Sequence, residues 1–183
     1  IIMKTILGNK RTPMLIIDKN PKILNRKTLN ARMAAINGFS IFGRNHVYLL
    51  DKNENIDYKS LNNFLSEYSK KIFFIFGFTS IVYESLVKKL LKKSLKFNFK
   101  NGILLHGGGW KKMENMKISN KIFKEHLNKQ TGLKNIFNYY GLVEQTGSIF
   151  IECKCGYFIT SVFSDILIRD RNFNVLKNGS RGF

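Results

Sequence analysis

The stretch Ile72-Phe73-Phe74-Ile75-Phe76 decides the fold that we expect, because it is the longest uninterrupted apolar run in the sequence. A strand that is apolar without alternation has both faces covered, which is typical of the centre of a parallel sheet. Gly77 follows the run and is expected to end the strand. The run is far shorter than the ~20 apolar residues that a membrane-spanning helix needs. We therefore expect a buried central strand and no membrane span.

Strand-like and helix-like patterns alternate on both sides of this run, which predicts an α/β fold with a largely parallel sheet flanked by helices. Further strands are expected at 14–17, 46–50, 102–105 and 136–140, and helices at 29–37, from 58 onward after an Asp57 N-cap, at 79–93 and at 117–130. Gly38 is expected to stop the first of these helices. Short β-type segments at 148–152, 157–160 and 166–169 have no helix between them. They predict a small antiparallel appendage at the C-terminal end.

The composition is typical of one basic, globular domain. Its 183 residues are 44% hydrophobic, which is enough to fill a core, and the formal net charge is +19. Such a surface attracts polyanions, nucleotides or acidic partners without choosing among them. The sequence starts with Ile1-Ile2 ahead of Met3 and shows no charged-then-apolar leader. We expect a piece of a longer protein with a cytoplasmic location.

Cys153 and Cys155 are separated by one residue, and we expect this spacing to be too close for an ordinary disulfide. The pair agrees with a reducing compartment. A zinc site would need two more ligands, and His46, His106 and His126 are scattered along the chain. Buried or strand-edge thiols are the simpler interpretation.

Two loops follow consecutive expected strands and should therefore open onto the same edge of the sheet, where α/β folds bind ligands. The first is His106-Gly107-Gly108-Gly109-Trp110-Lys111-Lys112, and the second is Tyr140-Gly141-Leu142-Val143-Glu144-Gln145-Thr146-Gly147. Three glycines in a row let a flat or charged group approach the main chain. Each loop alone also has a plain structural interpretation: turn glycines, a solvated carboxylate at Glu144, and a hydrogen-bonded histidine at a strand end.

Five separated blocks of the chain, taken in order, resemble the acyl-protein synthetase of the bacterial bioluminescence fatty-acid reductase complex and its relatives. They are 13–18, 31–39 with Phe42-Gly43, 76–79, 106–111, and 140–147 followed by Ile168-Arg169-Asp170. This family is similar to adenylate-forming enzymes, in which a carboxylate reacts with ATP to give an acyl-adenylate and the acyl group then passes to a thiol. The resemblance implies ATP and Mg²⁺ as cofactors. It implies a fatty acid or other carboxylic acid as substrate, and a protein or carrier thiol as acceptor.

The same resemblance implies roles for individual residues. Main-chain groups of Gly107, Gly108 and Gly109 would line the adenine pocket, with Tyr140 against the base; we place the neighbouring His106 and Gly141 in the same cofactor-binding set. Glu144 would hold Mg²⁺ through a hard oxygen ligand and act as a catalytic residue. Thr146 is the candidate for a phosphate contact, since Val143 stands where relatives commonly carry Thr.

The family resemblance also implies motifs and a domain that have no counterpart in this sequence. A Ser/Thr/Gly-rich phosphate loop is expected before Ile1, and a ribose-binding Asp and a mobile lid domain after Phe183. We therefore expect residues 1–147 to be part of a nucleotide-binding subdomain and 148–183 to be a β-rich appendage truncated before the lid. Weak nucleotide binding and poor turnover follow, because catalysis needs the groups oriented together.

Two other functions remain open on the sequence. A basic nucleic-acid-binding protein is the first, since lysines and aromatics interleave at Lys96-Phe97-Asn98-Phe99-Lys100. The sequence contains no helix-turn-helix, zinc-finger or aromatic RNA-binding motif, so we expect no specific nucleic acid partner. An inactive remnant of the enzyme is the second.

Overall fold

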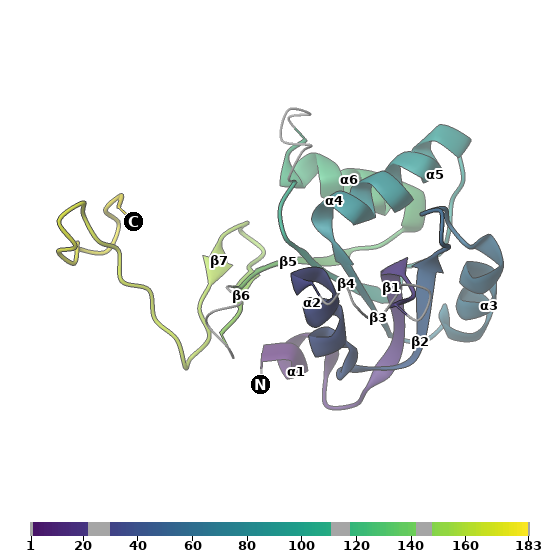
Figure 1. Cartoon of the computed structure of the whole chain (residues 1–183), viewed down its shortest axis with the longest axis horizontal. Coiled ribbons are helices and arrows are strands. Elements are labelled where there is room, and N and C mark those ends of the chain that lie inside the picture. Colours follow the sequence, from purple (N-terminus) through teal and green to yellow (C-terminus); the bar gives the residue numbers. More distant parts are fainter. Residues whose placement is uncertain (1, 22–29, 111–117, 142–147, 183) are drawn as a thin grey trace. The chain divides into compact units, whose positions relative to one another are not determined.

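The computed structural model describes residues 2–21, 30–110, 118–141 and 148–182, and the chain forms two compact units (Figure 1). The first unit is Ile1–Tyr139 and the second is Tyr140–Phe183. Among the described residues, no helix has the length and apolar character needed to cross a bilayer.

A parallel sheet forms the centre of the first unit. Its strands lie in the order β2-β1-β3-β4-β5, and every neighbouring pair is parallel. Their bounds are β1 Thr12–Lys19, β2 Gly43–Leu50, β3 Phe73–Phe78, β4 Gly102–Gly107 and β5 Asn135–Tyr140. The apolar run 72–76 forms most of the middle strand, β3, in which Phe73 to Phe76 are at most 1% exposed. Ile72 precedes the strand and is 57% exposed. The predicted α/β fold is confirmed.

Helices connect the strands of this sheet. They are α1 Ile2–Leu7, α2 Ala31–Ser40, α3 Tyr58–Tyr68, α6 Asn120–Thr131, and a continuous helix made of α4 Thr79–Ile81, the π-helical segment η2 Val82–Val87 and α5 Lys88–Lys93. Asp57 caps α3 as predicted, because its carboxylate accepts from the Ser60 N–H. Ser119 caps α6 in the same way.

Helices cover both faces of the sheet. One face holds the main apolar core, in which Leu15, Phe73 and Leu104 of the strands pack with residues of α3, η2, α5 and α6. Side chains alternate between the two faces of a strand, so Phe76 points to the opposite face. There, its ring lies 4.6 Å from that of Phe39 in α2. Burial on both sides is what makes the central strand continuously apolar.

The prediction that Gly38 and Gly77 end their elements is wrong. Gly38 lies inside α2, which continues to Ser40, and Gly77 lies inside β3, which continues to Phe78. A Cβ on Gly77 would lie 2.7 Å from Val82 Cγ2 and 3.1 Å from Ile17 Cβ. Glycine at this position serves close packing of the helix on the strand rather than strand termination.

The second unit contains a short antiparallel pair, β6 Phe150–Glu152 and β7 Phe158–Ile159, as the predicted appendage requires. Residues 166–169, where a strand was expected, are described by the structure and do not form one. Arg169 makes an isolated β-bridge to Val175. Several apolar side chains of this unit are exposed, among them Val162, Phe163 and Phe173.

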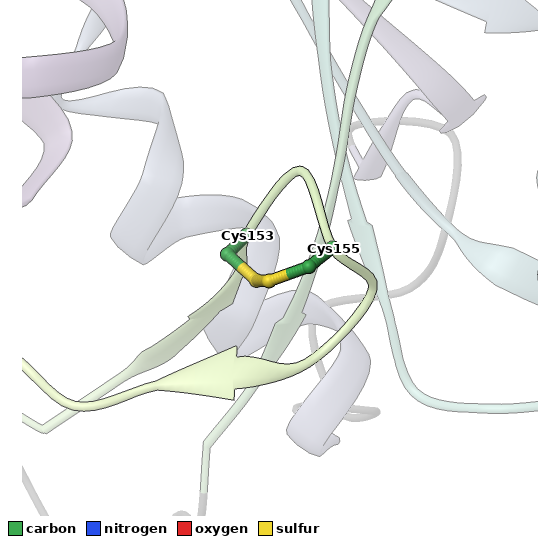
Figure 2. The surroundings of a disulfide bond; sticks show 2 residues. All are labelled: Cys153 and Cys155. Atoms are coloured by element: carbon green, nitrogen blue, oxygen red, sulfur yellow. A yellow bond between two sulfur atoms is a disulfide. The ribbon is translucent and has the colours of Figure 1, made fainter.

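The turn between β6 and β7 joins Cys153 and Cys155 in a disulfide (Figure 2). The expectation that these cysteines lie too close in sequence to pair is therefore wrong, and the cysteines do not indicate a reducing compartment. A tight turn brings their Cα atoms to 5.3 Å, within the usual range for disulfides. In that turn, the Gly156 N–H donates to the Cys153 carbonyl, and Gly156 has a φ of +85° that favours glycine.

Candidate functional site

The strands of the first unit are parallel, so their carboxyl ends meet at one edge of the sheet, where α/β proteins bind ligands. The glycine loop, residues 106–110, begins with the last two residues of β4 and continues beyond the strand at this edge. Thr79, the first residue of α4, follows the neighbouring strand β3. Phe78 pairs with Gly107 across the two strands, which sets the loop beside the start of the helix.

Each glycine of the loop has a different reason for lacking a side chain. A Cβ on Gly107 would lie 2.6 Å from the Tyr139 ring and 2.7 Å from the Tyr139 carbonyl oxygen. Gly108 has a φ of +80°, and a Cβ there would lie 2.6 Å from the Phe78 ring. Gly109 has a φ of +63° and open space around it. The first two glycines are required by packing within the protein, whereas the third leaves main chain open to a ligand.

Contacts at both ends hold the glycine loop in place. At its start, the Thr79 hydroxyl donates to the Gly107 carbonyl over 3.0 Å and lies 2.9 Å from His106 Nδ1. At its end, the Trp110 ring packs edge-on against Tyr83 and Phe123, with centroid distances of 5.5 Å and 5.6 Å. A loop fixed at both ends keeps its shape before a ligand arrives, which lowers the entropic cost of binding.

His106 is buried beneath the loop rather than exposed in it. Its side chain is 1% exposed, and its ring centroid lies 4.7 Å from that of Phe123 in α6. Burial, with a smaller contribution from the charge of Lys124, lowers the pKa of His106 to about 3. The imidazole is therefore neutral near pH 7, and it contacts the loop through Thr79.

Aromatic rings lie under the loop on the opposite face of the sheet. Tyr139, which pairs with Gly107, packs edge-on against Phe39 at 4.9 Å and lies 6.1 Å from Phe76. Burial raises the pKa of Tyr139 to about 12, so its phenol stays protonated. Phe78 lies beside Gly108, and these rings give the glycine loop a rigid apolar base.

The residues predicted in the second loop divide between described and undescribed positions. Tyr140 is 50% exposed, and its ring packs near Phe150 and Phe158 within the second unit. Gly141 is also exposed. Glu144 and Thr146 lie outside the described residues, as do Lys111 and Lys112.

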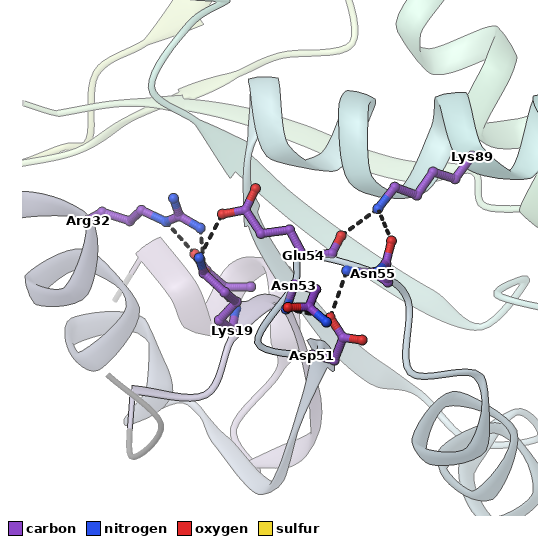
Figure 3. A network of polar contacts seen from close by, with 8 residues as sticks. Lys19, Arg32, Asp51, Asn53, Glu54, Asn55 and Lys89 are labelled. Carbon is purple, nitrogen blue, oxygen red and sulfur yellow. Dashed lines mark hydrogen bonds and ion pairs between the residues drawn. The ribbon is translucent and has the colours of Figure 1, made fainter. Parts of the chain in front are cut away.

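The edge also carries an ion-pair network that our sequence analysis missed (Figure 3). Arg32 Nε and Nη2 donate to the two carboxylate oxygens of Asp18 over 2.6 Å and 2.5 Å. Lys19 pairs with Glu54 at 2.7 Å, and the hydrogen bond from Lys19 lowers the pKa of Glu54. Lys89 donates to the Glu54 carbonyl. The signal in the sequence is Asp18, a carboxylate that comes directly after four apolar residues.

This network stands at the point where the strand order changes direction, between β1 and β3. A pocket of about 200 Å³ beside it is lined in part by Asp18, Asn30 and Arg32. That volume is below the ~300–1,000 Å³ of typical ligand pockets. The pocket that these described residues line is therefore smaller than a typical ligand pocket.

A magnesium site is not formed by the residues that the structure describes. Within them, no three His, Cys, Asp or Glu side chains gather in a way that would hold a metal ion. Asp18, the buried carboxylate at the edge, is already paired with Arg32. The metal role of Glu144 stays a prediction, because Glu144 lies outside the described residues.

Comparison with known proteins gives one match. A family model described as acyl-protein synthetase, LuxE, matches residues 1–183. No curated protein and no solved structure matches the chain.

Proposed function

We propose, because the chain belongs to the acyl-protein synthetase (LuxE) family, that it forms part of the ATP site of an enzyme that activates a fatty acid or related carboxylic acid. A substrate carboxylate oxygen attacks the α-phosphorus of ATP, the bond from that phosphorus to the β-phosphate oxygen breaks, and pyrophosphate leaves. A thiol of a protein or carrier then attacks the acyl carbon. The thiol loses its proton, AMP leaves, and a thioester forms.

The glycine loop is the observation that carries this proposal. It lies at the carboxyl edge of a parallel sheet, is held at both ends, and leaves the main chain open at Gly109. A flat purine ring can approach a backbone that has no Cβ more closely than any side chain would allow. We assign Gly109 to this contact, and Gly107 and Gly108 to the packing that supports it.

The net charge of the chain favours an anionic ligand. Attack of a carboxylate on ATP brings two anions together, so positive groups stabilise the transition state. Lys19 and Arg32 are paired with Glu54 and Asp18 near the end of β1, so the positive field that would attract ATP is that of the whole chain, whose net charge is +19. An ATP-dependent reaction also supports a cytoplasmic location.

The family resemblance implies further site residues at the end of β5 and in the segment that follows it. We assign Tyr140 and Gly141 to the base, Glu144 to Mg²⁺, and Thr146 to a phosphate. His106 acts from beneath the loop, since its ring is buried. Mg²⁺ would supply charge neutralisation on the phosphate oxygens, and carboxylate oxygens are the ligands it prefers.

Pyrophosphate release tests this function. Purified protein with ATP, Mg²⁺ and a mixture of fatty acids is expected to release pyrophosphate slowly, and the Glu144→Ala substitution is expected to lower the rate at least about tenfold by removing the metal ligand. Glu125→Ala, an exposed carboxylate of α6, is the matched control and should keep the wild-type rate. Equal rates for the two variants would remove Glu144 from the metal site.

A further inference from the structure

Thr79 lies where the end of β3, the start of α4 and the end of β4 meet at the edge of the sheet. It follows β3 directly, it starts α4, and its hydroxyl reaches the last residue of β4, Gly107, over 3.0 Å. The side chains of Thr79 and His106 are both buried, and the hydroxyl lies 2.9 Å from His106 Nδ1. Gly107 and its neighbours therefore have a polar anchor beneath an otherwise apolar region.

The number of hydrogens that each group can donate fixes the direction of these hydrogen bonds. A threonine hydroxyl has one hydrogen to donate, and the Gly107 carbonyl can only accept it. The neutral imidazole must then donate from Nδ1 to the hydroxyl oxygen, which leaves Nε2 without a hydrogen. His106 Nε2 is buried and has no hydrogen-bond partner in the described part of the chain. This agrees with a nitrogen that carries no hydrogen and lies beside the apolar Phe123 ring.

Holding the Gly107 carbonyl sets the plane of the whole peptide group between Gly107 and Gly108, because that group is planar. The two residues that follow, Gly108 and Gly109, both have left-handed φ values, and glycine has the widest conformational freedom of any residue. A peptide plane that could rotate would let the next two residues change direction. The hydroxyl therefore orders the loop before ligand binding, and less entropy is lost on binding.

We propose that Thr79 and His106 are positioning residues for nucleotide binding, which orient the glycine loop through the hydrogen-bond chain from His106 Nδ1 to the Thr79 hydroxyl to the Gly107 carbonyl. This inference rests on the proposed ATP site. Neither side chain touches the nucleotide, and their effect is transmitted through the loop.

The test compares ATP affinity with thermal stability for matched threonine variants of the full chain. Thr79→Val removes the hydroxyl and keeps the shape, and it is expected to weaken ATP binding about fivefold to tenfold. Thr79→Ser keeps the hydroxyl and should bind within about twofold of wild type. The control is Thr131→Val, because Thr131 is also buried, donates to the Leu127 carbonyl over 2.6 Å, and ends α6 at the opposite edge of the sheet. It should lower the melting temperature without changing ATP affinity.

The outcomes separate this inference from the proposed function. If wild type does not bind ATP, the ATP site and this inference both fail. If wild type binds but Thr79→Val binds equally well, the ATP site stands and the positioning role is wrong. Nitrogen NMR of the wild-type ring needs no variant and should find the proton of His106 on Nδ1; a proton on Nε2 would break the hydrogen-bond chain and overturn the inference.

Discussion

Acidification from pH 7 to pH 4 is expected to lower the free energy of unfolding by about 3 kcal/mol through His106 alone. Burial lowers the pKa of this imidazole to about 3 in the folded chain, against an ordinary value of 6.5. Between these two values the unfolded chain binds a proton that the folded chain does not. The contribution is fully present above pH 6.5 and is lost as the pH falls toward 3.

Urea unfolding at pH 7 and pH 4 measures this effect in wild type and in His106→Asn. The asparagine keeps a donor near Thr79 but does not titrate, so the variant should lose about 3 kcal/mol less than wild type on acidification. Carboxylates titrate in both proteins and cancel in the difference. An equal loss in the two proteins would show that the imidazole accepts a proton in the folded state, contrary to its burial.

Two glycine-to-alanine substitutions are expected to change stability in opposite directions. Gly107→Ala should lower the free energy of unfolding by about 2–3 kcal/mol, because the new Cβ would meet both the ring and the carbonyl oxygen of Tyr139. A backbone oxygen in a paired strand cannot move aside as a flexible side chain can. Gly38→Ala should raise the free energy by about 0.5–1 kcal/mol, because Gly38 lies inside α2 with open space around it.

Thermal or urea unfolding of the two variants measures both signs in one experiment. Gly38→Ala is the control, since it makes the same chemical change at a position where the structure has room. Stabilisation by both substitutions would mean that β4 and β5 lie further apart at Gly107 than their pairing indicates.

The sequence was sufficient to predict the fold class because the strongest signals are local. A continuous apolar run requires cover on both faces, and Asp57 before a helical apolar spacing predicts the start of α3. The same reasoning failed at Gly38 and Gly77. Whether a glycine ends an element or lets another element pack closely depends on its neighbours in space. For Gly77 one of these is Ile17 of β1, which lies far away in the sequence and is invisible to a local pattern.

The candidate site was predicted in part. The glycine loop and its edge follow from the order of strands and helices, whereas the role of Thr79 depends on the pairing of β3 with β4. The pair of Asp18 and Arg32 joins residues on two elements, and a charged residue gives no periodic signal of its partner. The disulfide was missed because its formation depends on the turn at Gly156 rather than on the spacing of the cysteines.

The central claim is that ATP binds at the glycine loop, and an NMR titration of the ¹⁵N-labelled chain with ATP tests it most directly. The account predicts that amide signals of Gly108, Gly109 and Trp110 shift together, with one saturating affinity, in wild type. It also predicts that adenosine, which has the base without the phosphates, shifts the same three amides. Shifts confined to the exposed lysines of α5 and α6, or no saturable shift at the loop, would contradict the account.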